Sequence, residues 1–397
     1  MSRYLSSLAL VGLAVMTIGS QTSAQGDPLT RARALHKQSP LIDGHNDYPW
    51  ALRGLDPGRD FSKAEISKPV PSLMTDIPRL RQGGLGGQFW SVYTPSTMQG
   101  KEAVRVTLEQ IDIVHRMTKR WPETFEMAYT AADVERSFKA GRIGSLIGME
   151  GGHSIDNSLA TLRMFYALGA RYMTLTHSTN LAWADASTDK AALGGLSKFG
   201  EEVIREMNRL GMLVDLSHVS AETMEDALRV SEAPVIFSHS SARAICNVPR
   251  NVPDHVLQLT AKNGGVVMVT FVPGFISQAV ADHDAKPAAE RGPTPPKATL
   301  AQVADHIDHI RKVAGIDHIG LGGDFDGITQ VVAGLEDVSK YPDLTAELIK
   351  RGYTDQDIKK ILGLNVLRVM TQAEKVAAGL QKTRQPSTAT IEQLDAK

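Results

Sequence analysis

The sequence predicts an α/β fold, a single (β/α)₈ barrel of the TIM type. Eight short apolar segments rich in β-branched residues alternate with longer segments in which apolar residues recur at helical spacing. Strand–helix alternation repeated eight times favours a parallel sheet that closes on itself. A doubly wound open sheet is the alternative, but no G-x-G-x-x-G motif follows the first apolar segment.

The eight expected strands are short apolar runs, and six of them end in a histidine or a carboxylate. The run "IGSLIGME", for example, is apolar or small until its final glutamate. Strands of a parallel barrel have this composition because the barrel interior covers one face and helices cover the other, so both faces are buried. The expected strands are residues 40–45, 86–93, 143–150, 171–177, 211–218, 233–239, 264–272 and 318–326.

The expected helices lie between these strands and after the last of them. Their apolar residues are spaced three and four positions apart, which places them on one face. The expected helices are residues 101–120, 131–141, 158–169, 197–210, 220–231, 253–263, 299–314, 343–351 and 354–372. Residues 279–298 are rich in Pro, Ala and charge, and we expect a long flexible loop there that lies over the barrel mouth.

The two ends of the chain are expected to lie outside the barrel. Residues 1–24 contain Arg3, an apolar stretch and then small residues up to Ala24, which is typical of a secretory signal peptide. We therefore predict a periplasmic or secreted protein, with the catalytic domain at 25–380 and a polar tail at 381–397. That tail offers no lipid-anchor signal, so no stable membrane anchor is expected.

Composition excludes several classes of protein. The 397 residues carry a formal net charge of −1 with no basic block, so nucleic-acid binding has no electrostatic support. The single cysteine, Cys246, allows no internal disulfide. With 42% hydrophobic residues, the chain can bury a core large enough to be stable without one.

Histidines and carboxylates gather where the expected strands end. In a TIM barrel the carboxyl ends of all strands meet at one face, where active sites lie. Side chains nearly 300 positions apart are thus expected to form one pocket. The strand-end residues are His45, Asp47, Glu150, His177, His218, His239, Asp324 and Asp326.

Four imidazoles and several carboxylates at one face indicate a metal site. Such ligands suit zinc, and also nickel, cobalt, manganese or iron. One ion seldom needs more than four protein ligands, so this number predicts two ions, with Glu150 as the candidate bridge between them. His45 and Asp47 form an H-x-D pair on one face of an extended chain. No G-x-S-x-G elbow supports a serine nucleophile.

Several motifs resemble those of the renal, or membrane, dipeptidase family of zinc-dependent, amidohydrolase-like barrels. The motifs include "LIDGHNDYPW", "GMEGGHSID", "LTHSTNLAWAD", "LVDLSHVS", "PVIFSHSSARAICNVPRNVPDHVL" and "LGGDFDG", in order over residues 38–372. Where related barrels place a modified lysine at the fourth strand, this chain has His177. The family's mammalian members carry a lipid anchor and disulfides, whereas this chain looks like a soluble exported form, expected to be a non-covalent homodimer.

The resemblance implies a role for each site residue. It places His45 and Asp47 on one zinc ion, His218 and His239 on a second, and Glu150 between the two. It assigns acid–base catalysis to Asp324, contact with the substrate and its tetrahedral intermediate to His177, and capture of the C-terminal carboxylate to Arg250. Asp326 is kept as a structural residue.

The implied activity is hydrolysis of dipeptides that have a free C-terminal carboxylate, through a metal-bridging hydroxide. Dipeptides with a C-terminal D-residue and β-lactams are further candidate substrates, because a β-lactam also presents an amide carbonyl beside a carboxylate. Two alternatives stay open at this point. The same barrel can hydrolyse another amide or a lactone. The chain can also be an exported binding protein without catalytic activity, although the full set of motif residues argues against this second alternative.

Overall fold

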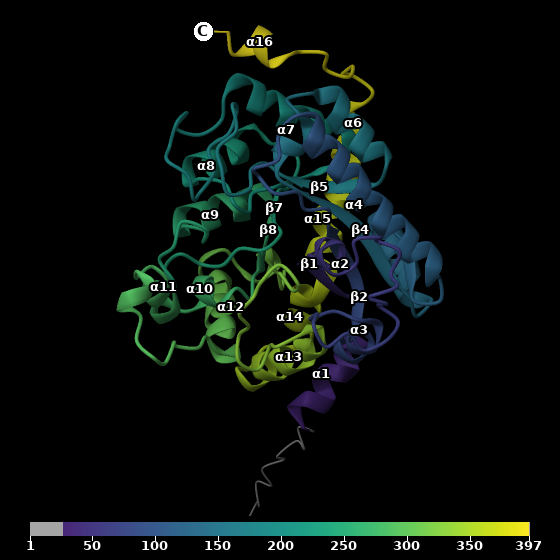
Figure 1. Ribbon diagram of the computed structural model, residues 1–397, viewed down its shortest axis with the longest axis vertical. Coiled ribbons are helices and arrows are strands. Elements are labelled where there is room, and N and C mark those ends of the chain that lie inside the picture. Colours follow the sequence, from purple (N-terminus) through teal and green to yellow (C-terminus); the bar gives the residue numbers. More distant parts are fainter. Residues whose placement is uncertain (1–26, 397) are drawn as a thin grey trace, which may run out of the picture.

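The computed structural model describes residues 27–396, and the predicted signal peptide at 1–24 lies outside them. Eight parallel strands form a closed barrel in the order β2-β1-β9-β8-β7-β6-β5-β4, and β4 pairs with β2 to close it (Figure 1). The predicted fold class is therefore confirmed. The strands are β1 (Leu41–Asn46), β2 (Leu85–Ser91), β4 (Ile143–Glu150), β5 (Ala170–Thr174), β6 (Leu213–Asp215), β7 (Ile236–Phe237), β8 (Val266–Val269) and β9 (Ile319–Leu321).

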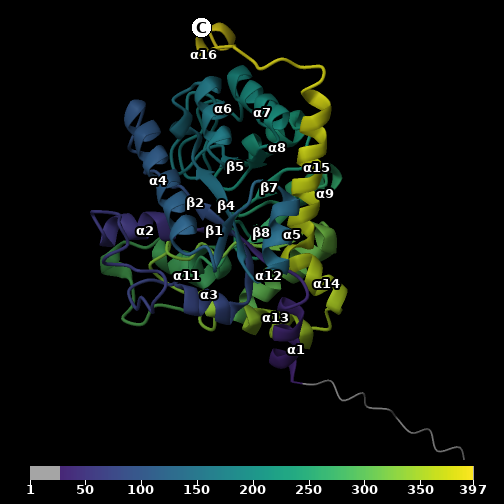
Figure 2. The same ribbon diagram turned by 90° about the vertical axis from the view of Figure 1, so that its right-hand side faces the viewer.

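Helices surround the barrel, as the alternating pattern predicts (Figure 2). Those that match expected segments are α4 (Lys101–Arg120), α5 (Ala131–Lys139), α6 (Leu159–Ala167), α7 (Lys198–Leu210), α8 (Ala221–Val230), α9 (Asp254–Asn263), α12 (Leu300–Val313) and α13 (Tyr341–Lys350). The expected helix at 354–372 is three elements: α14 (Asp355–Lys359), a π-helical turn (Lys360–Leu364) and α15 (Asn365–Leu380).

Several short elements were not predicted. A ninth strand, β3 (Phe125–Met127), pairs with the first residues of β4 and is too short to show a period. Three short helices each carry a proline in their first turn, which suits a helix start but reads in sequence as a turn. They are α1 (Pro28–His36), α2 (Tyr48–Leu55) and α3 (Ile77–Gly83).

The expectation of a long loop at 279–298 is wrong for its first part. The helix α11 (Gln278–Asp284) covers its beginning, directly after the short helix α10 (Pro273–Ile276), and a 3₁₀ turn lies at Ala288–Glu290. Tertiary contacts stabilise this segment: Val280 is buried, and the backbone amide of Asn247 donates to the side-chain carbonyl of Gln278 at 2.7 Å.

The C-terminal segment packs on the barrel's outer layer. The short helix α16 (Ile391–Leu394) lies beside α7, and the Ser197 hydroxyl donates to the carboxylate of Asp395 at 2.5 Å (Figure 1). Within residues 27–396, none of the helices combines the length and the apolar character needed to cross a bilayer.

Burial explains why the chemistry lies where strands end. All residues of β1, β2 and β4 are buried, since the strands have the barrel interior on one face and the helical layer on the other. Side chains that must meet a substrate therefore come from the ends of strands and from the loops that follow them.

Candidate metal centre

The end of β1 and the segment after β9 lie side by side at one end of the barrel. The Asp324 amide donates to the His45 carbonyl at 3.1 Å, and the Asp47 amide donates to the Phe325 carbonyl at 2.9 Å. Gly327 makes this close packing possible, because a Cβ there would lie 2.2 Å from Asp47 Oδ2. His45, Asp47 and Asp324, which were expected at one site, are therefore neighbours in space although most of the chain separates them in sequence.

Glu150 lies at the centre of the cluster, and its two carboxylate oxygens face different partners. Oε2 lies 3.5 Å from His45 Nε2. Oε1 lies 3.0 Å from His218 Nε2 and 3.5 Å from His239 Nε2. His177 Nε2 is also on the Oε1 side, at 3.7 Å. A carboxylate with one oxygen toward each of two groups has the geometry of a bridge.

Three overlapping groups of side chains could each hold a cation, with all ligand atoms of a group within 4.8 Å of one another. The groups are His45 with Glu150 and His239, Glu150 with His177 and His218, and His45 with Asp47 and Asp324. His45 Nε2 and Asp47 Oδ1 are buried and have no hydrogen-bond partner. Since an unpaired buried polar atom is costly, a cation between these donors fits the arrangement.

Hydrogen bonds at the far side of two imidazoles select the ring nitrogen that faces the cluster. Tyr172 donates its hydroxyl proton to the Gly44 carbonyl at 3.1 Å, so its oxygen accepts from His45 Nδ1, 2.8 Å away. Ser238 likewise donates to Asp215 at 2.6 Å and accepts from His239 Nδ1 at 2.8 Å. Both histidines therefore direct Nε2, and not Nδ1, into the cluster, which is the nitrogen that would bind a metal ion.

The cluster also controls its own charge. Burial by itself would raise the pKa of Glu150, but the neighbouring imidazoles hold the pKa of that carboxyl well below its usual range. Burial and the nearby Arg250 cation hold the pKa of His218 well below the ordinary value, so this ring is neutral. Although burial opposes it, Tyr172 and the carboxylates of Asp47 and Glu150 hold the pKa of His45 well above its ordinary value, so a cation that binds at His45 would displace a proton.

Asp324 is a carboxyl group whose affinity for a proton is raised, which suits a group that accepts and returns one. Burial raises the pKa of Asp324 well above its usual range, and the carboxylates of Asp47 and Glu150 add to the effect. Its side chain is still 15% exposed, so a bound substrate can reach it. Asp324, Asp326 and His218 all have positive φ, at 61°, 66° and 70°, a strained conformation that clusters at functional sites.

The cluster opens into a cleft of about 450 Å³. Arg250 and His177 line this cleft together with Asp47, Glu150, His218 and Asp324. Of the predicted site residues, His45 and His239 lie beneath its floor, fully buried. The structure adds Trp50, Tyr93 and Phe275, which the sequence analysis did not single out; an aromatic residue within an apolar run carries no signal that separates a cleft wall from a core.

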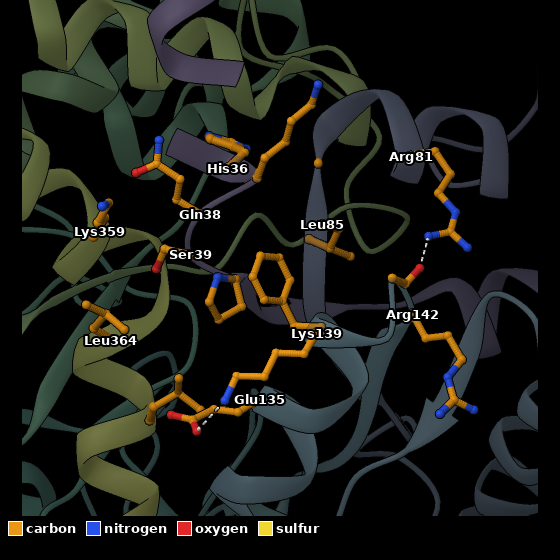
Figure 3. Close-up of a pocket in the computed structure, with 16 residues that line it drawn as sticks. His36, Gln38, Ser39, Arg81, Leu85, Glu135, Lys139, Arg142, Lys359 and Leu364 are labelled. Carbon is orange, nitrogen blue, oxygen red and sulfur yellow. Dashed lines mark hydrogen bonds and ion pairs between the residues drawn. The ribbon is translucent and has the colours of Figure 1, made fainter. Parts of the chain in front are cut away.

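A larger hollow, of about 670 Å³, lies at the opposite end of the barrel and contains none of the predicted site residues. It lies where His36 ends α1 and where Leu85 begins β2 (Figure 3). Lys139 there faces Glu135, and Arg81 donates to a backbone carbonyl, so two of its cations already have partners.

A parallel barrel whose strand ends bring imidazoles and carboxylates around one cleft defines a metal-dependent hydrolase. The family model of membrane dipeptidase, peptidase family M19, matches residues 29–384. The chain therefore belongs to the membrane dipeptidase family, and it is a metallo-dipeptidase.

Individual relatives agree with this assignment. Dipeptidase verJ of Clonostachys rogersoniana is 43% identical over 377 residues, which is 92% of each chain. The probable dipeptidase PvdM of Pseudomonas aeruginosa is 26% identical, with a TM-score of 0.78 over 88% of this chain and 99% of that one. A metallopeptidase of Rhodobacter sphaeroides, liganded with a phosphinate mimic of L-Ala-D-Ala, is 25% identical, with a TM-score of 0.74 over 84% and 99%.

We expect Tyr172→Phe to weaken metal binding about 10–100-fold, because His45 loses the acceptor that fixes its tautomer while the ring packing is kept. Competition with a chromophoric chelator measures the affinity. Tyr353→Phe is the matched control, since its buried hydroxyl donates to Asp308 at 2.6 Å on the outer helices. Equal metal affinity in both variants would contradict a positioning role for Tyr172.

Proposed function

We propose that this dipeptidase uses two zinc ions and cleaves dipeptides that carry a free C-terminal carboxylate. The substrate class is inferred from Arg250, which is buried at the wall of the cleft and has no acidic partner among the described residues. Its side chain is 3% exposed and lines the cleft, yet it forms no ion pair with any of residues 27–396. Its nearest hydrogen-bond partner is the Ser240 hydroxyl at 3.5 Å, and its guanidinium lies over the Phe275 ring at 5.1 Å.

An unpaired buried cation at a cleft wall calls for an anionic substrate group. Burial lowers the pKa of Arg250 to about 10, so the guanidinium is charged at neutral pH. A substrate carboxylate would compensate that charge by a charge-assisted and bidentate contact. This supports a dipeptide with a free carboxylate over a neutral amide or lactone.

The distances around Glu150 support the set of metal ligands that the sequence suggests. His45 and Asp47 would hold one ion, His218 and His239 the other, and Glu150 would contribute one oxygen to each. Imidazole and carboxylate ligands together suit zinc. Two such ions would supply Lewis-acid polarisation of the scissile carbonyl and acidify a water molecule.

Proton transfer and stabilisation of the developing negative charge are the work of two side chains, Asp324 and His177. Asp324 takes the proton from the attacking water and passes it to the leaving amine, as a base and then as an acid. His177 lines the cleft, and its Nδ1 lies 3.0 Å from the Ser178 hydroxyl. Its other ring nitrogen, Nε2, is therefore the one that would contact the substrate. A donor at that position stabilises the oxygen that gains negative charge.

Further parts of the proposal concern substrates and location. A relative with a bound mimic of L-Ala-D-Ala supports the acceptance of a C-terminal D-residue. β-Lactams share the amide carbonyl and the carboxylate that Arg250 would bind. We also propose export to the periplasm or the medium after cleavage near Ala24, and a non-covalent homodimer without a stable membrane anchor.

Metal removal tests the proposal. We expect purified mature protein to contain about two zinc ions per chain, to lose dipeptide hydrolysis on chelation and to regain it when zinc is added. Elemental analysis beside a dipeptide assay measures both quantities. Full activity in metal-free protein would contradict the zinc mechanism, and zinc-loaded protein that cleaves no dipeptide would contradict the proposed substrate class.

A further inference from the structure

A second hollow, of about 430 Å³, adjoins the catalytic cleft and is here called the annex. The annex and the cleft share four lining residues, so the two are continuous. The shared residues are Val272, Phe275, Gly327 and Ile328.

The walls of the annex are mainly apolar near the cleft and polar at the far end. Val248 and Ala281 extend the apolar wall beyond the shared residues. Asp284, Thr329 and Gln330 lie at the exposed rim. Apolar side chains that face an open hollow favour an apolar occupant, since contact removes their surface from water.

Two site residues fix where the C-terminal residue of a dipeptide would lie relative to the annex. Arg250, which would hold the carboxylate, stacks on the annex residue Phe275. Asp324, which would protonate the leaving amine, touches the annex at Gly327, where a Cβ would lie 2.6 Å from its Oδ1. The carboxylate and the amine of that residue are bonded to the same Cα, and so is its side chain.

We propose that the annex is the subsite for the side chain of the C-terminal residue, and that it selects medium-sized or large apolar side chains, aliphatic or aromatic. This inference rests on the proposed function. The N-terminal residue of the dipeptide would instead lie toward Trp50 and Tyr93, whose rings pack edge to face at 5.1 Å on another part of the cleft wall.

The outer wall of the annex is preorganised. The Asn251 side chain donates to the Phe275 carbonyl at 2.8 Å, and His306 Nε2 lies 3.0 Å from the Ile276 carbonyl. Both side chains are buried, so they hold α10 in place. The next helix, α11, carries Ala281 into the annex wall, which gives the beginning of segment 279–298 a part in substrate choice.

Kinetics on a panel of dipeptides, measured for the wild type and for a variant whose annex is filled by a larger side chain, test the proposal. Zinc-loaded wild-type protein is expected to show kcat/KM at least about tenfold higher for Gly-Leu and Gly-Phe than for Gly-Gly. Ala281→Phe, which places a ring in the annex, is expected to reduce this ratio about tenfold through KM. The ratio of Leu-Gly to Gly-Gly, which varies the N-terminal side chain, is expected to stay as in wild type.

Ala289→Phe is the matched control, because Ala289 is exposed, lies further along the same segment and does not line the annex. Val248→Trp fills the annex from a different loop and replaces Ala281→Phe if that variant does not fold. An equal loss for all substrates, a change in Leu-Gly in place of Gly-Leu, or no C-terminal preference in wild type would overturn the annex proposal. Absence of all dipeptide cleavage in zinc-loaded wild type would instead overturn the proposed function.

Discussion

Asp324→Asn is expected to lower the turnover of dipeptides by about 10²–10⁴-fold while the zinc content stays that of the wild type. Asn has nearly the same shape as Asp and tolerates the positive φ of this position, so the backbone is kept. What is lost is the group that accepts and returns a proton. Steady-state kinetics with elemental analysis of the same preparation measures both quantities.

Asp326→Asn is the matched control for this experiment. Asp326 also has positive φ, and its Oδ1 accepts from the Met74 amide at 2.6 Å, a contact within the fold. We expect this change to act on stability more than on turnover. Near-normal turnover of Asp324→Asn would contradict the acid–base role, and loss of zinc from that variant would make Asp324 a metal ligand.

Arg250→Met is expected to lower kcat/KM by about 10²-fold or more for dipeptides with a free carboxylate, and to change little for the same dipeptides as C-terminal amides. Methionine keeps an apolar side chain against Phe275 but removes the charge that would pair with the substrate. Parallel kinetics on the acid and amide forms of one dipeptide measure the difference.

Arg171→Met is a control for the loss of a half-buried arginine that stacks on an aromatic ring. The Arg171 guanidinium also stacks on an aromatic ring, 4.3 Å from that of Tyr166, and it forms no ion pair within residues 27–396, but it lies at the start of β5, away from the cleft. We expect both substrate forms to be affected equally there. The same result for Arg250→Met would mean that Arg250 does not bind the carboxylate.

The alternation of strands and helices was sufficient to predict the barrel. Each buried strand needs an apolar run, and each such run ends where a polar side chain can reach the barrel mouth. His45, Glu150 and Asp324 were therefore expected together, although they lie far apart in sequence, and the structure brings them within a few ångströms of one another. Short elements such as β3 escaped prediction, since three residues contain no measurable period.

The sequence by itself thus determined the fold class and the strand-end histidines and carboxylates that meet at the cleft, because apolar runs and the polar residues that end them are local features of the chain. Only the tertiary structure decided which nitrogen of His45 and His239 faces the cluster, since Tyr172 and Asp215 come from other strands. It also decided that Arg250 lies buried without an acidic partner and that α11 forms a wall beside it. Each of these depends on distances between segments remote in sequence, which no local pattern specifies.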